Sequence, residues 1–139
     1  MYWPERLTER LYRTRDGVSE LYLVRRMLLP RNRYFNVFLH QFFASDEEGL
    51  HDHPCDFLLI GLKGWYWEDT FAGTTEREAG RVRLMTAETF HRIVVPRGQE
   101  GAVWTLAIRG PNRKTWGFLE PGLEDGWRRW NDAAKAARR

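Results

Sequence analysis

The chain has 139 residues, of which 42% are hydrophobic, 14% aromatic and 29% charged, and its formal net charge at pH 7 is +3. This length suits one domain with a substantial buried core, and the composition excludes an intrinsically disordered protein. No run approaches the roughly 18 apolar residues of a membrane span, and so small a net charge does not by itself indicate nucleic-acid binding. The single cysteine, Cys55, excludes an intrachain disulfide, so a reducing, cytoplasmic compartment is expected.

The predicted elements, in chain order, begin with a short helix over residues 4–12, where Leu7 and Leu11 repeat at i+4. From Glu20 onward the pattern changes to short strands separated by turn residues. A polar turn is expected at residues 45–49 and another turn at 72–75. About eight strands are predicted, at residues 21–29, 34–43, 57–71 (one or two strands, bent near Gly61 or Gly64), 81–84, 89–95, 102–109 and 115–119.

Short strands at this spacing predict an all-β sandwich or barrel in a single domain, residues 1–139, with its core at about residues 20–119. Beyond the barrel, Trp127, Trp130, Ala134 and Ala137 recur at spacings of 3, 4 and 3, which predicts a C-terminal helical tail over about residues 123–139. We interpret the basic, tryptophan-containing tail as a solvated helix docked on the barrel in preference to a nucleic-acid site.

Three of the four histidines are spaced as a metal site would require. His51 and His53 form an H-x-H pair, and His91 follows thirty-eight residues later. Residues i and i+2 of a strand point to the same face, about 7 Å apart, so a third ligand from a neighbouring strand would complete a site. Imidazole suits Zn, Fe, Cu or Ni. The alternative is that these are ordinary surface or core histidines.

The spacing around these histidines resembles the cupin superfamily. Its first motif, G-x5-H-x-H-x3/4-E-x6-G, is matched by His51, His53 and Gly64, whereas Ser45 stands in the leading glycine slot. The acidic slot falls on an apolar residue, Phe57 or Leu58, and so the usual glutamate ligand is absent.

The second cupin motif, G-x5-P-x-G-x2-H-x3-N, is matched in register by Gly80 and His91. Thr86, Glu88 and Val95 stand in its proline, glycine and asparagine slots. The resemblance implies a double-stranded β-helix (jelly roll) with short N- and C-terminal helices, and a metal in the barrel mouth. It carries over His51, His53 and His91 as the ligands.

The missing glutamate makes the implied site resemble the three-histidine sites of thiol-dioxygenase cupins. Fe(II) is therefore the favoured cofactor, with Zn, Ni or Mn as alternatives. The expected function is metal binding, with metal-dependent oxygenase chemistry on a small polar molecule. Alternatives are a metal-dependent isomerase and a non-catalytic ligand-binding or accessory barrel. The expected partner is a small molecule, without membrane or nucleic acid, and pairing through strand edges predicts a homodimer.

Four further side chains are candidates for the same site, each with a structural alternative. His40 lies on the preceding predicted strand, and Asp56 stands three residues beyond His53. Cys55 would share the face of the two histidines on a regular strand, although burial by packing is the better expectation for a free cysteine. Glu88 lies three residues before His91, where a turn carboxylate is the alternative. Asp52 should point away from the site and bond an imidazole or a turn amide.

Overall fold

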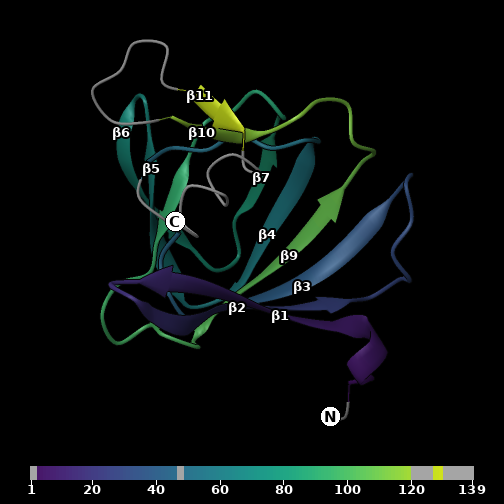
Figure 1. The fold of residues 1–139 in the computed structure, drawn as a ribbon, viewed down its shortest axis with the longest axis horizontal. Coiled ribbons are helices and arrows are strands. Elements are labelled where there is room, and N and C mark those ends of the chain that lie inside the picture. The colour runs from purple at the N-terminus through teal and green to yellow at the C-terminus, as the bar shows by residue number, and fades with distance from the viewer. Residues whose placement is uncertain (1–2, 47–48, 120–126, 130–139) are drawn as a thin grey trace.

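The computed structural model describes residues 3–46, 49–119 and 127–129, and these are built almost entirely of antiparallel β-strands (Figure 1). The larger sheet has the spatial order β1-β2-β3-β9-β4-β7, with bounds Thr8–Arg15, Val18–Met27, Asn36–Phe42, Val103–Arg109, Phe57–Lys63 and Val82–Met85. The second sheet has the order β6-β5-β8, with bounds Gly73–Glu78, Trp65–Thr70 and Arg92–Val94. A separate pair is formed by β10 (Gly117–Leu119) and β11 (Trp127–Arg129).

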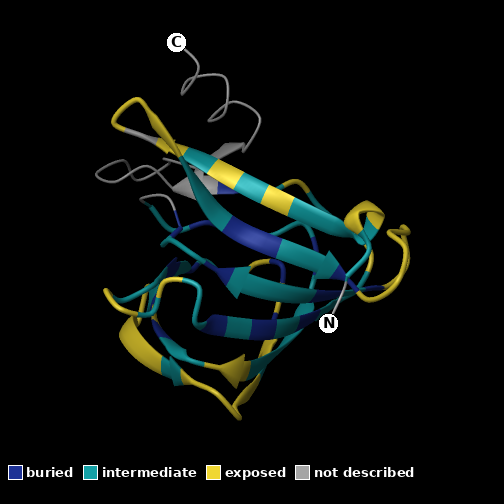
Figure 2. Cartoon of the chain, turned by 90° about the horizontal axis from the view of Figure 1, so that it is seen from below, coloured by how far each residue is buried: buried dark blue, intermediate teal, exposed yellow. Residues whose placement is uncertain are grey.

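The two main sheets face each other across the core. β9 lies between β3 and β4, so strands far apart in the sequence are neighbours in the larger sheet. The main core cluster joins both sheets, and its buried members are Leu23, Phe42, Tyr66, Ile93 and Val103. Figure 2 shows the buried segments gathered between the layers. This arrangement confirms the predicted all-β fold and places the second half of β5 and the start of β8 against the barrel interior.

Alternation along the strands explains which side chains reach that interior. On β9, Val103, Thr105 and Ala107 are buried and the residues between them are partly exposed. On β5, Tyr66 and Glu68 are buried, whereas Trp67 is exposed. Every second side chain of a strand therefore points inward. On β5 this alternation directs Tyr66 and Glu68 toward the interior.

The bend predicted between the two strands of residues 57–71 lies at Gly64, which connects β4 to β5. Its φ is +74°, and a Cβ there would lie 2.5 Å from the carbonyl oxygen of Ala102. Glycine is therefore required on two grounds, the left-handed backbone and the close approach of another chain segment.

The helix predicted over residues 4–12 is wrong beyond its first turn. Glu5–Leu7 form a 3-10 helix, and the chain then enters β1, which pairs with β2. Leu7 and Leu11 are both covered, but by packing on the two core clusters. Pairing with a neighbouring strand has overridden a weak local i+4 signal.

Two other local predictions differ from the structure. Residues 72–75 were expected to be a turn, but β6 begins at Gly73 and pairs with β5. The predicted helical tail over residues 123–139 lies mostly outside the described residues. Its described part, Trp127–Arg129, is a strand paired with β10.

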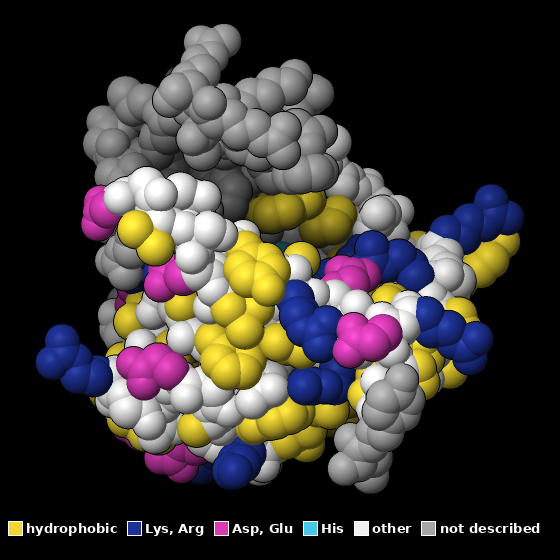
Figure 3. Space-filling model, turned by 60° about the horizontal axis from the view of Figure 1, so that its bottom comes forward, with side chains coloured by type: hydrophobic (Ala, Val, Ile, Leu, Met, Phe, Trp, Pro, Cys, Tyr) yellow, Lys and Arg dark blue, Asp and Glu magenta, His cyan; other side chains and the backbone are white. Residues whose placement is uncertain are grey.

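The surface carries both signs of charge. On the face drawn in Figure 3, hydrophobic side chains gather near the centre, and Lys or Arg side chains alternate with Asp or Glu side chains around them. Among the described residues, no helix has the length and apolar character needed to span a membrane.

Candidate metal centre

The backbone brings the H-x-H pair beside the third histidine. His51 and His53 lie in the segment between β3 and β4, and His91 immediately precedes β8. His51 and His91 form an isolated antiparallel bridge in which each N–H donates to the other's carbonyl at 2.9 Å. A directly opposed pair in an antiparallel ladder places both side chains on the same face. The cross-strand convergence expected from the sequence is therefore present, although neither histidine belongs to a longer strand at that point.

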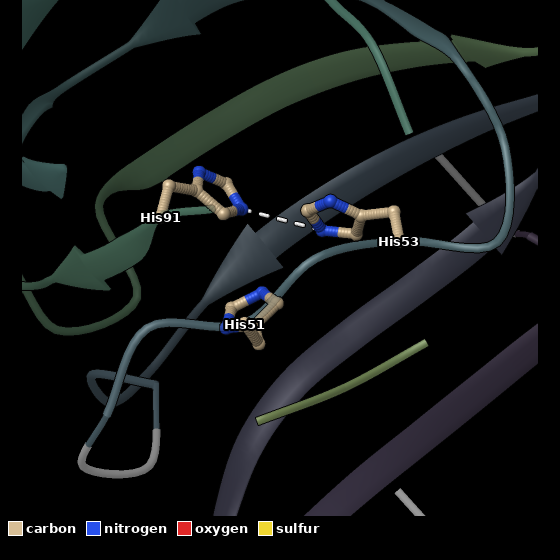
Figure 4. Close-up of side chains that lie close together, drawn as sticks. All are labelled: His51, His53 and His91. Carbon is tan, nitrogen blue, oxygen red and sulfur yellow. Dashed lines mark hydrogen bonds between the residues drawn. The ribbon is translucent and has the colours of Figure 1, made fainter. Parts of the chain in front are cut away.

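The three imidazoles point toward one another in Figure 4. One potential ligand atom from each of His51, His53 and His91 lies within 4.8 Å of the other two. The Nε2 atoms of His53 and His91 are 3.2 Å apart. Two nitrogens bound at about 2.0–2.1 Å to one tetrahedral ion are separated by about 3.3 Å, so this spacing is compatible with two ligands of a shared metal.

Burial keeps the three imidazoles neutral at physiological pH. It lowers the pKa of His51 to about 4 and that of His91 to about 4. Burial also lowers the pKa of His53 well below its usual value, with further lowering by the two neighbouring imidazoles. A neutral imidazole has a free lone pair, so the cluster is in the protonation state that a metal requires.

A buried carboxylate contacts the ring nitrogen of His91 that faces away from His53. Oε2 of Glu68 lies 3.0 Å from Nδ1 of His91, and Glu68 is 0% exposed. With Nδ1 as the donor, Nε2 keeps its lone pair toward the other histidines. Glu68 also pairs with two guanidinium groups, those of Arg77 at 3.1 Å and of Arg83.

Glu68 was not predicted from the sequence, because it lies outside the acidic slot of the motif. Of the two apolar residues at that slot, Phe57 packs its ring on His53 at a centroid distance of 4.5 Å. The available signal was strand alternation, since Glu68 lies two residues after Tyr66 on β5 and so shares its inward face.

A second buried carboxylate lies beside His51. Oδ2 of Asp46 is 3.9 Å from Nε2 of His51 and accepts the backbone N–H of Ile93 at 2.7 Å. Its other oxygen accepts the hydroxyl of Tyr22, and burial and this carboxylate raise the pKa of Tyr22. Asp46 thus ties the loop before the H-x-H pair to β8 and β2.

Asp52, between the two histidines, points away from them as expected. It accepts the backbone N–H of Gly117 at 2.8 Å and forms an ion pair with Lys114. These contacts hold the segment before β10 against the site, where the ring of Trp116 lies 6.1 Å from that of His51.

Two of the four additional candidates lie in the interior but outside the three-histidine group. His40 on β3 accepts a hydrogen bond at Nε2 from Nε of Arg25 at 3.0 Å and stacks on Phe38. Burial, with the charge of Arg25, lowers the pKa of His40 well below its usual value. Cys55 is 0% exposed, and burial raises the pKa of its thiol.

The other two candidates form an ion-pair network at the surface. Asp56 accepts the backbone N–H of Ala87 at 2.8 Å and a guanidinium N–H of Arg113 at 2.7 Å. Glu88 pairs with Arg113 at 2.6 Å. Because both carboxylates are engaged there, the structure brings neither of them to the histidines.

The donor set suits a divalent transition metal. Within the described part of the chain, the grouped ligand atoms come from three neutral imidazoles and no carboxylate. Such a set leaves the full charge of a divalent ion uncompensated and, in a tetrahedral or larger shell, leaves positions for other ligands. The cluster is therefore compatible with a metal site of the kind that the sequence predicts.

Comparison with known proteins bears on the fold. No family model and no curated protein matches the sequence. Solved structures do match: a cupin-2 domain protein from Rhodospirillum rubrum has a TM-score of 0.64 and 13% identity, over 100% of this chain and 86% of that one. The polyketide cyclase RemF from Streptomyces resistomycificus has a TM-score of 0.60 and 15% identity, over 75% of this chain and 74% of its own.

The Fe(II) form of HppE also matches, with a TM-score of 0.57 and 14% identity over 78% of this chain. This chain spans about 59% of the length of HppE. Identities this low report the fold and leave the activity open. Together with the two facing antiparallel sheets, they confirm the resemblance read from the histidine and glycine spacing: the chain has the cupin fold, a double-stranded β-helix.

Proposed function

We propose that this protein binds one divalent transition metal through His51, His53 and His91. The observation that carries the proposal is the convergence of three neutral imidazoles, two of them buried and that of His53 partly buried, with His91 oriented by Glu68. Metal-binding histidines regularly donate their second ring N–H to a carboxylate in this way.

We further propose that the metal is Fe(II) and that the protein is an oxygenase acting on a small polar molecule. An iron(II) ion held there would supply Lewis acidity and the electrons that dioxygen chemistry requires. The all-imidazole donor set suits iron, and one fold neighbour, HppE, was determined in its Fe(II) form. We also propose a cytoplasmic location, in keeping with the free, buried Cys55.

The chain's own residues contribute positioning. The Glu68 carboxylate fixes the ring orientation of His91, and the His51–His91 bridge fixes the backbone of both. The ring of Phe57 covers one side of His53 and replaces a charged ligand with an apolar wall. The site is thus built to hold three imidazoles in one geometry while adding no negative charge of its own.

The test is reconstitution of the metal-free full chain with Fe(II) under anaerobic conditions. Nitric oxide, a surrogate for dioxygen, should bind to the iron and give a paramagnetic signal if a coordination position is open. Oxygen uptake is then measured with a panel of small polar substrates, with the His91→Ala variant as control. Uptake that depends on both substrate and His91 supports the oxygenase. Stoichiometric metal with no uptake would contradict the oxygenase while leaving the metal site intact.

A further inference from the structure

A second polar feature of the barrel is a pocket of about 410 Å³ between the two sheets. It is bordered by residues of β4, β5, β6, β7 and β9, which include Leu59, Tyr66 and Thr105. None of the three clustered histidines lines it. Its size falls within the range of sites for small molecules.

Strand alternation aims three arginines at this pocket. Arg81 immediately precedes β7 and Arg83 lies within it, two residues further on, so extended backbone directs both side chains to the same face. Arg83 pairs in register with Leu59, and Arg77 on β6 pairs with Tyr66, which places both arginines on inward-facing rows. All three arginines line the pocket.

Two glutamates also border the pocket, but they belong to the outer face. Glu76 and Glu78 flank Arg77 on β6, and they pair in register with Trp67 and Trp65. Both glutamates are exposed. The charged groups that the strand pattern turns inward are therefore guanidiniums, with Glu68 as the acidic partner.

The charges around Glu68 do not balance. Its single carboxylate receives two guanidiniums, those of Arg77 and Arg83. Arg81 adds a further positive charge at the pocket wall, which the exposed Glu76 and Glu78 also border. In addition, Nε of Arg77 is buried and has no hydrogen-bond partner among the described residues. A buried N–H donor without an acceptor is costly, and an oxyanion that reached Arg77 would satisfy it.

We propose that this pocket binds a small anion, a phosphate or carboxylate group, through the guanidiniums of Arg77, Arg81 and Arg83. Guanidinium groups present paired N–H donors that match both kinds of oxyanion. The site is separate from the three histidine nitrogens and does not depend on bound metal. It adjoins them through Glu68, which contacts Arg77 and Arg83 with one oxygen and His91 with the other.

The experiment is calorimetric titration of the metal-free full chain with inorganic phosphate and, separately, with succinate, at constant ionic strength. Arg81→Gln is the main variant, because Arg81 is exposed and is not one of the two arginines that hold Glu68. Arg77→Gln is the second. Arg97→Gln removes the same charge from an exposed position in the turn between β8 and β9 and is the matched control.

The expected result is saturable binding of at least one anion that weakens at least fivefold in Arg81→Gln or Arg77→Gln and is unchanged in Arg97→Gln. Binding of phosphate alone, or of succinate alone, supports the proposal and identifies the group recognised. The absence of saturable binding of both anions overturns it. Equal affinity in wild type and both pocket variants overturns it as well, and so does an equal loss in Arg97→Gln.

Discussion

Glu68 and His91 are joined at 3.0 Å, between Oε2 of the carboxylate and Nδ1 of the imidazole, at a place where the two residues are 0% and 3% exposed. The contact gives the two ring nitrogens of His91 different roles, because Nδ1 is hydrogen-bonded to the carboxylate and Nε2 faces the other two histidines. Glu68 therefore connects β5 to the proposed metal site.

Replacement of the Glu68 carboxylate should weaken metal binding. Glu68→Gln keeps the size of the side chain but removes its charge, so His91 loses part of its orientation and basicity. We expect the affinity for a divalent metal to fall about 10–100-fold, measured by competition with a chromophoric chelator on protein shown to be folded. Glu76→Gln, on the exposed face of β6, is the control. Equal affinities in both variants would show that Glu68 has no part in metal binding.

The buried imidazoles predict acid sensitivity of the metal-free protein. In the unfolded chain a histidine binds a proton near its ordinary pKa of about 6.5, whereas burial lowers the pKa of His51 and His91 to about 4. Between these values the unfolded state holds more protons, so stability is complete above pH about 6.5 and is lost as the pH falls toward 4. The loss should be on the order of 2–3 kcal/mol for each histidine.

Urea unfolding of the metal-free protein at a series of pH values measures this loss. His51→Gln removes one of the titrating groups and should flatten the pH dependence by about one histidine's contribution. A variant with the same pH dependence as the wild type would refute the assignment of acid sensitivity to these imidazoles.

The bend between β4 and β5 should not tolerate a side chain at Gly64. Gly64→Ala places a Cβ 2.5 Å from the Ala102 carbonyl oxygen in addition to forcing a left-handed residue. Gly17→Ala is the matched control, since its φ of +76° is similar and its Cβ would meet no atom within 4 Å. Gly17→Ala should cost about 1–2 kcal/mol, and Gly64→Ala at least about 2 kcal/mol more. Denaturant unfolding measures the loss of stability in each variant. An equal loss in both would contradict the close approach of Ala102 to Gly64.

The lone cysteine should be inert in the folded protein. Cys55 is 0% exposed and burial raises its pKa, so little thiolate is available to a reagent. Labelling with a chromogenic disulfide should be slow under native conditions and rapid in denaturant. Fast stoichiometric labelling of native protein would place the thiol at an accessible position.

His51, His53, Gly64 and His91 stand at the spacing of the cupin motifs, and that resemblance was sufficient to predict the fold and the three residues that converge. The sequence did not reveal β1 or β6, since their residues, TERLYRTR and GTTERE, are mostly polar and carry little strand signal before they pair with the neighbouring β2 and β5. Glu68 was missed for a different reason. Its role depends on β5 crossing beside His91, a relationship that the motif's acidic slot does not encode.

Measurement of metal content is the direct test of the three-histidine metal site. The full chain, purified without a nickel column and reconstituted with Fe(II) or Zn, should retain about one equivalent of metal per chain after desalting. His51→Ala, His53→Ala and His91→Ala should each retain far less, while His40→Ala should retain as much as the wild type. If the wild type retained no stoichiometric metal, or if the three site variants retained as much as the wild type, these histidines would not form a metal site.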